Sequence, residues 1–505
     1  MNRERSRHSR SIILALTVLL GAGIGEGQQV NAHPGITPAE GSAGQMEQRM
    51  DQLMSALDNM RLQLNQSQRE MEQMRTELQE LRAQLAQSHT TDEPTQSAAA
   101  LQASVKQLQD QTDVLQAEVK QHDQTKLESV SKYPLRISGM LLFTSLLNSS
   151  NVDNIDLPII ARPQYGTQPA GSLSATARQT ILGLEATGPS LWGARSSADI
   201  SVDFFGGIAY ADYSTSAGLL RLRTARANLD WSHRSLAAAF DKPLISPLQP
   251  TSFVSVGEPA LAWSGNLWTW SPQLEFKDTS LFSNKKLGLE AGLIDVSAPG
   301  PPTSNALRAA GPSEQSRQPG YETRLSSSIP FGDRAIEIGG GGYYSRQAYE
   351  DGHHLDAWAG AVDWRIPFTR RLELSGEYYR GRGLGGLGGG AFKDYAPYAN
   401  DTIQRGINAE GGWGQFKIKM TPSLEANFAL GEDNAFAIDI RGSDLETEQN
   451  DYLNLARNRT GFANVIFRPK TYLLFSAEYK NIYSWPIAGP VNSNQSLGLA
   501  AGYLF

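Results

Sequence analysis

Arginine and carboxylate side chains recur inside short alternating segments in the later part of this 505-residue sequence. The charged residues with the clearest potential for chemistry are Arg221, Arg223, Arg226, Asp199, Asp203 and Glu275. Guanidinium groups hold carboxylates and phosphates through paired hydrogen bonds, so arginines that line a channel suit anionic solutes. We therefore interpret these six residues as pore-lining residues that set selectivity.

The segment 218–231 does not place its three arginines on one face. Strict alternation puts Arg226 on the polar face, whereas Arg221 and Arg223 fall on the opposite face. Two explanations are open: a β-bulge turns these two arginines inward, or they lie above the lipid zone in the mouth of a loop.

Arg226 also has two interpretations. It either pairs with Asp199 or Asp203 of the neighbouring segment as a salt bridge of the wall, or it contacts a solute, and both can hold. In either case Arg226 faces the lumen.

Other kinds of site find little support in the sequence. The run Gly381–Gly386 matches G-x-G-x-x-G but lacks the strand and helix of a nucleotide fold, so we expect a flexible outer loop. His233, His353 and His354 have no metal-ligand spacing. Zero cysteines exclude disulfides, thiolate zinc sites and thiol catalysis, and a net charge of −7 disfavours nucleic-acid binding. We expect no enzyme activity, cofactor or metal.

The elements that must position the charged residues are β-strands. From 135 to 505 helical periodicity gives way to short alternating segments separated by Gly, Pro, Ser and Asn, and we count about sixteen of them. Their links alternate between short turns and long connections such as 148–175, 243–264 and 383–405. This asymmetry predicts an all-β transmembrane barrel of antiparallel strands in an outer membrane, with the short turns in the periplasm.

The end of the sequence carries an independent signal. Apolar residues alternate up to Tyr503 and Phe505, and the sequence finishes on an aromatic side chain. This pattern resembles the sorting signal that outer-membrane barrels present to their assembly machinery. We therefore assign Tyr503 and Phe505 as the barrel assembly signal.

The start of the sequence predicts export. Four arginines precede the apolar run 12–20, and small residues follow at 30–32, as in a cleaved signal peptide covering 1–32. A linker at 33–45 follows. From 46 to 130, apolar residues repeat with a 3.5-residue period, broken near 89–100 around Pro94. This period predicts a periplasmic α-helical coiled coil that oligomerises, and its Leu and Met mixture does not choose between dimer and trimer.

Three short motifs resemble the early strands of DcaP-like trimeric porins, within the wider group of phosphate-selective porins. They are the runs 178–184 (RQTILGL), 202–207 (VDFFGG) and 220–226 (LRLRTAR). The resemblance implies a periplasmic coiled coil, a sixteen-stranded barrel, and homotrimers that pass small anionic, often aromatic, solutes. It also implies that the long third loop folds inward and narrows the channel. Here that loop, Pro243–Ser264, departs from the family: it is rich in Ser and Pro, with Glu258 as its only charge.

Two functions compete on this fold. The first is a passive diffusion porin for small hydrophilic, anionic solutes, with weak to moderate anion selectivity that depends on Arg221, Arg223 and Arg226. The second is a structural anchor whose coiled coil spaces the outer membrane from the cell wall. Expected partners are further copies of the chain, as a homotrimer, together with outer-membrane lipid, the barrel assembly machinery, small anionic solutes and peptidoglycan.

Overall fold

The computed structural model describes residues 134–164, 170–206, 218–279, 287–296, 310–349, 352–398, 404–447 and 452–505. The predicted signal peptide at 1–32, the linker at 33–45 and the coiled coil at 46–130 lie outside the described residues.

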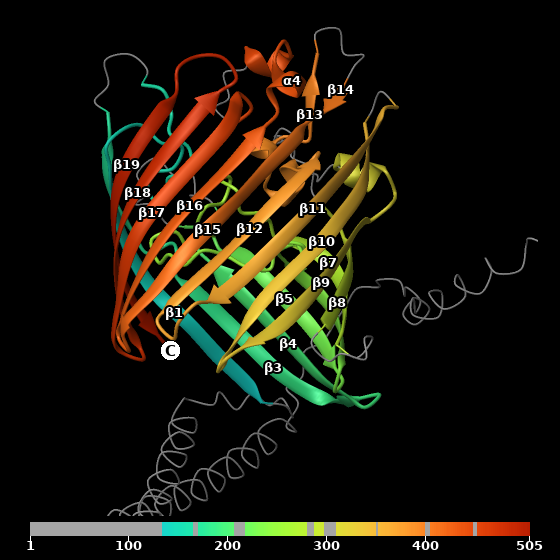
Figure 1. Ribbon diagram of the computed structural model, residues 1–505, viewed down its shortest axis with the longest axis vertical. Coiled ribbons are helices and arrows are strands. Elements are labelled where there is room, and N and C mark those ends of the chain that lie inside the picture. Colours follow the sequence, from blue (N-terminus) through green and yellow to red (C-terminus); the bar gives the residue numbers. More distant parts are fainter. Residues whose placement is uncertain are drawn as a thin grey trace, which may run out of the picture. The chain divides into compact units, whose positions relative to one another are not determined.

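The alternating segments form one antiparallel sheet that closes into a barrel (Figure 1). The strand β1 (Leu135–Asn148) pairs with β19 (Asn492–Leu504) on one edge, and with both β2 (Ser172–Thr176) and β3 (Ile181–Leu191) on the other. The sheet contains 17 strands. Since β2 and β3 share one position beside β1, the described wall has sixteen positions, which confirms the predicted fold.

The remaining strands follow one another around the wall in chain order, except for a small separate pair. Those from the first half are β4 (Ala194–Asp203), β5 (Arg221–Asp230), β6 (Arg234–Asp241), β7 (Ser271–Asp278), β8 (Leu287–Ile294), β9 (Gly320–Phe331) and β10 (Arg334–Ala348). Those from the second half are β11 (His354–Pro367), β12 (Leu372–Arg382), β15 (Asn408–Thr421), β16 (Leu424–Ala435), β17 (Leu455–Lys470) and β18 (Leu473–Pro486). The separate pair is β13 (Tyr395–Pro397) and β14 (Gln404–Gly406).

Helices are short in the described residues. They are α3 (Pro312–Gln315), α4 (Ala437–Ile440) and the 3₁₀ turns Gly385–Leu387, Gly390–Phe392 and Asp444–Glu446. None of them has the length and apolar character needed to cross a bilayer.

Each strand sorts its side chains by alternation between the lumen and the outer surface. On β9, Glu322 and Arg324 are buried inside the barrel, whereas Tyr321 and Leu325 are exposed on the outside. The connections also divide: tight turns such as 332–333 lie at the same end as the C-terminus, and long connections such as 242–270 lie at the other (Figure 1). This is the asymmetry that the sequence predicts.

Two local predictions are wrong. The sequence predicts a strand over 265–277, but β7 begins at Ser271, and Trp268 is buried inside the barrel instead of facing outward. Gly265 has a φ of +97° and lies against the Gly412 backbone, so the chain turns along the inner wall before it enters β7.

The glycine-rich run after β12 is the second correction, because it does not extend outward as a flexible loop. Leu384 and Leu387 are fully buried inside the barrel, and the backbone N–H of Trp268 donates to the Leu387 carbonyl at 3.2 Å. Asp433 on β16 holds the next turn by accepting from the N–H groups of Gly390 and Ala391. Buried apolar contacts and a wall carboxylate therefore tie this loop to the lumen.

Candidate pore constriction

The connection 242–270 between β6 and β7 folds into the barrel and follows its inner wall, and we call it the girdle loop. In chain order its hydrogen-bond partners are Glu322 on β9, Glu377 on β12, Gln415 on β15, Asn464 on β17, Glu478 on β18, Gln179 between β2 and β3, and Arg221 on β5. This is also the order of those strands around the sheet. The loop thus passes most of the way around the lumen.

Prolines set the spacing of the first contacts. Pro243, Pro247 and Pro250 have no backbone N–H, and the residue after each one donates its N–H to the wall. Leu244 donates to Glu322 at 2.8 Å, Leu248 to Glu377 at 2.6 Å and Thr251 to Gln415 at 2.6 Å. Proline at these three positions therefore creates regular wall contacts.

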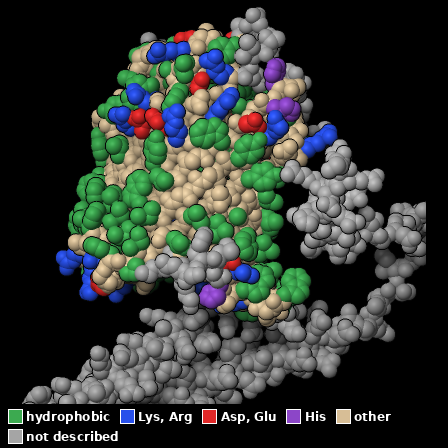
Figure 2. Space-filling view, turned by 45° about the vertical axis from the view of Figure 1, so that its right-hand side comes forward, with side chains coloured by type: hydrophobic (Ala, Val, Ile, Leu, Met, Phe, Trp, Pro, Cys, Tyr) green, Lys and Arg blue, Asp and Glu red, His purple; other side chains and the backbone are tan. Residues whose placement is uncertain are grey.

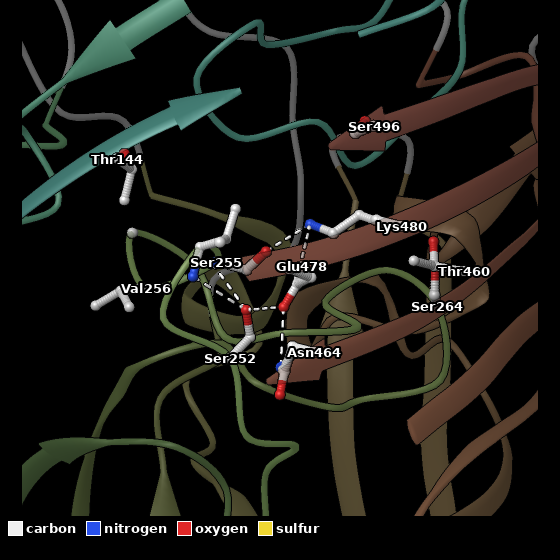
Figure 3. A network of polar contacts seen from close by, with 12 residues as sticks. Thr144, Ser252, Ser255, Val256, Ser264, Thr460, Asn464, Glu478, Lys480 and Ser496 are labelled. Carbon is white, nitrogen blue, oxygen red and sulfur yellow. Dashed lines mark hydrogen bonds and ion pairs between the residues drawn. The ribbon is translucent and has the colours of Figure 1, made fainter. Parts of the chain in front are cut away.

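A polar network fixes the middle of the girdle loop to β17 and β18 (Figure 3). The Ser252 hydroxyl donates to Glu478 at 2.5 Å, and Asn464 donates its amide N–H to the same carboxylate at 3.1 Å. The Lys480 ammonium donates to the Ser255 hydroxyl at 2.5 Å. Buried polar groups are stable only when they are paired, so this network specifies one position for the loop.

Gln179 holds the loop further along the same side of the wall, beyond β19 and β1. It lies in the break between β2 and β3, is fully buried, and accepts from the N–H groups of Val256 and Gly257 at 2.7 and 2.8 Å. Its amide N–H donates to the Val254 carbonyl at 3.0 Å. The break between β2 and β3 thus places the Gln179 side chain where it binds the loop backbone at Val254, Val256 and Gly257.

Arg221 and Arg223 both point into the lumen. The register between β4 and β5 shifts at Val202, where Arg223 is the extra residue, so the structure contains the bulge that was one of the two explanations. The Asp203 carboxylate is fully buried and accepts hydrogen bonds from Arg221 at 2.7 and 3.1 Å and from Arg223 at 2.8 Å. Arg223 also donates to the Val256 carbonyl at 2.7 Å, and Arg221 donates to the Gly257 carbonyl. The two guanidinium groups therefore hold the loop as well as the wall.

Aromatic rings surround these arginines. The guanidinium carbons of Arg221 and Arg223 lie 5.1 and 4.8 Å from the Trp270 ring centroid, and Arg178 lies 4.7 Å from that of Phe205. Trp270 is half-buried, so part of this cationic and aromatic surface is accessible from the lumen.

Arg226 has different partners from those expected. Asp199 lies opposite it in the β4–β5 register, but the Arg226 guanidinium binds Glu275 at 2.7 and 2.9 Å and Asp241 at 3.1 Å. Arg226 therefore forms a salt bridge of the wall, but with Glu275 and Asp241 in place of Asp199 or Asp203, because β7 offers the bidentate geometry. Asp199 itself is exposed.

Glu258 is the one acidic residue of the girdle loop, and Asp153 and Asp203 lie near it. Burial and the Asp153 carboxylate raise the pKa of Glu258 to about 7, although Arg221 and the Trp263 indole N–H act in the opposite direction. Burial also raises the pKa of Asp153. Glu258 therefore changes charge near neutral pH, close to the arginine pair.

Tyr503 and Phe505 lie at the seam where the barrel closes. Both are exposed on the outer side, and the Phe505 N–H and carbonyl exchange hydrogen bonds with Gly139 on β1 at 3.1 and 3.0 Å. A side chain at Gly139 would collide with the Phe505 ring.

Several residues that build the constriction escape sequence reasoning, above all Gln179, Glu377 and Glu478. Their only signal is a polar residue on the lumen face of an alternating segment, which many residues share. Among the described residues, no three His, Asp or Glu side chains gather as a metal site.

No family model matches the sequence, and no curated protein matches it. The barrel resembles the crystal structure of the outer membrane channel DcaP of Acinetobacter baumannii, with a TM-score of 0.57 and 17% identity over 75% of this chain and 100% of that chain. Weaker likenesses are Salmonella typhi OmpF in complex with daunomycin (0.47, 10%, 74% and 98%) and an anion-selective porin from Comamonas acidovorans (0.46, 10%, 74% and 100%). The predicted resemblance to DcaP is confirmed at the level of the fold.

Proposed function

We propose that the protein is a passive outer-membrane porin for small hydrophilic solutes. The observation that carries this proposal is the path of the girdle loop: it follows the wall and is held there, as a constriction loop is. Sixteen wall positions enclose enough space for an aqueous channel. The DcaP-like fold agrees with this function.

The proposal includes a preference for anions at the face formed by Arg221, Arg223 and Trp270. Here Arg221 and Arg223 meet Asp203 of the wall, and Arg178 meets Asp156 of the connection between β1 and β2. A guanidinium surface beside the half-buried ring of Trp270 fits planar carboxylates. Lower in the lumen Arg226 faces Glu275 and Asp241, so the preference is weak.

Single-channel conductance of the refolded protein in a planar bilayer tests the function. We expect discrete steps and a reversal potential, in a salt gradient, on the anion side. A protein that inserts but does not conduct would instead support the structural anchor, which the 46–130 heptad pattern favours.

The rest of the chain belongs to the same proposal. A signal peptide at 1–32 directs export, a linker at 33–45 follows, and the coiled coil at 46–130 stays in the periplasm, where it supports a homotrimer and reaches toward peptidoglycan. Tyr503 and Phe505 present the barrel to the assembly machinery.

A further inference from the structure

The outer surface of the barrel is not uniform around its circumference. Outward-facing ion pairs join neighbouring strands from β10 to β17: Arg346 with Asp356 at 3.4 Å, Arg380 with Glu410 at 3.5 Å, and Arg459 with Glu432. Figure 2 shows charged side chains in a band near one end of the barrel, above a wall with few charges. Ionised groups on a lipid-facing wall are tolerated near the interface, so the band marks the level of the lipid headgroups.

A groove lies directly below two of these pairs. It is a hollow of about 680 Å³ in the outer wall that crosses β12, β15, β16 and β17. Tyr378 and Leu430 flank it, Gly412 and Gly414 form its floor, and Arg459 and Glu432 stand at its polar end. Glycine inside a strand leaves no side chain to pack and allows another molecule close to the backbone. A Cβ at Gly414 would meet no atom within 4 Å, so the space is open.

The polar end of the groove is suited to an anion. Arg457 and Arg459 both stack on Trp485, with guanidinium carbons 4.0 and 5.5 Å from its ring centroid. Together with Arg346 and Arg380, these arginines outnumber the three carboxylates of the band. Arginine binds phosphate through paired hydrogen bonds, and apolar walls below a cationic rim match an acyl chain below a phosphorylated headgroup.

We propose that this groove binds one molecule of a phosphorylated glycolipid of the outer leaflet, with its phosphate at Arg459 and an acyl chain over Gly412 and Gly414. The choice of leaflet rests on the proposed porin orientation, since the band lies at the end with the long connections.

Native mass spectrometry of the refolded full-length protein, titrated in detergent with bis-phosphorylated lipid A, tests the site. We expect one tightly held lipid per chain and roughly tenfold weaker binding in each of Gly414→Leu, whose Cβ meets no atom within 4 Å, and Arg459→Gln. The control is Gly340→Leu on β10, outside the groove, where a Cβ makes only ordinary contacts at 3.6 Å or more. This variant should bind as the wild type does.

Equal binding of dephosphorylated lipid A, or wild-type affinity in Gly414→Leu, would overturn the proposal. Conductance of the same variants separates the lipid site from the porin function, because none of the substitutions touches the lumen. A wild-type protein that binds lipid but does not conduct would contradict the porin function and leave the groove in place.

Discussion

The two ends of one strand use arginine in different ways. On β5, Arg221 and Arg223 reach past the wall to the carbonyls of the girdle loop, whereas Arg226 binds only the wall carboxylates Glu275 and Asp241. The bulge at Arg223 creates this difference, since it brings the upper pair onto the lumen face. The same side chain therefore positions the constriction at one level and adjusts its charge at the next.

The largest effect is expected from removing the upper pair. The double variant Arg221→Gln, Arg223→Gln leaves Asp203 buried without a cation and releases two loop carbonyls. Losing one side of a buried ion pair lowers the free energy of unfolding by about 3–5 kcal/mol. We expect higher and noisier single-channel conductance together with easier unfolding in urea. Unchanged conductance would show that these contacts do not hold the loop.

Gln179→Leu loosens the same loop without changing any charge. Each buried N–H or carbonyl left without a partner costs about 1–3 kcal/mol, so conductance should rise while the reversal potential stays near the wild-type value. Gln179→Glu is the matched variant, because it keeps the acceptor for Val256 and Gly257 and loses the amide donor to Val254, Thr144 and Asp156. A shift in selectivity with unchanged conductance would contradict a positioning role for Gln179.

Arg226→Gln is expected to change selectivity and to leave conductance almost unchanged. It leaves Asp241 without its arginine and Glu275 with only the more distant Lys277 at 3.8 Å, so the reversal potential should move toward cations with little change in conductance. Arg234→Gln, which removes an exposed arginine paired with Asp278 at the turn end of β6, is the control and should alter neither quantity. A conductance change in Arg226→Gln as large as in the double variant would show that Arg226 also positions the girdle loop, and would contradict the difference between Arg226 and the upper pair.

The smallest effect concerns pH. Because the pKa of Glu258 is raised to about 7, acidification through neutrality adds a proton and removes a negative charge near Arg221. Anion preference should therefore increase as the pH falls from 8 to 6. The raised pKa also means that stability from this group is present at low pH and is lost as the pH rises through about 7. Glu258→Gln should abolish both dependences, and a pH response that persists would assign them to another group.

Sequence alone predicts the wall well, because a strand that separates lumen from lipid must alternate. The segment 321–330, for example, becomes β9 with one residue added at each end. The inward fold of the third loop also follows from the family resemblance. Both depend on patterns that are local or shared with other porins.

The contacts inside the lumen are a different matter. Gln179 and Val256 are far apart in sequence, and no local pattern reveals that one binds the other. Alternation left two explanations for the position of Arg223 and could not choose between them, since a β-bulge inserts a residue without a fixed sequence signature. Trp268 fits an alternating strand equally well, and only its burial against the loop after β12 excludes that assignment.

The path of the girdle loop also sets an order of events in time. Its contacts include Gln179, near the beginning of the barrel, and Glu478, on the strand before the last. These two residues stand on the same inner ring only after β1 has met β19, so the narrow passage is completed after the wall and not with it. If assembly stops before that seam forms, the barrel stays open and the girdle loop lacks wall contacts on one side.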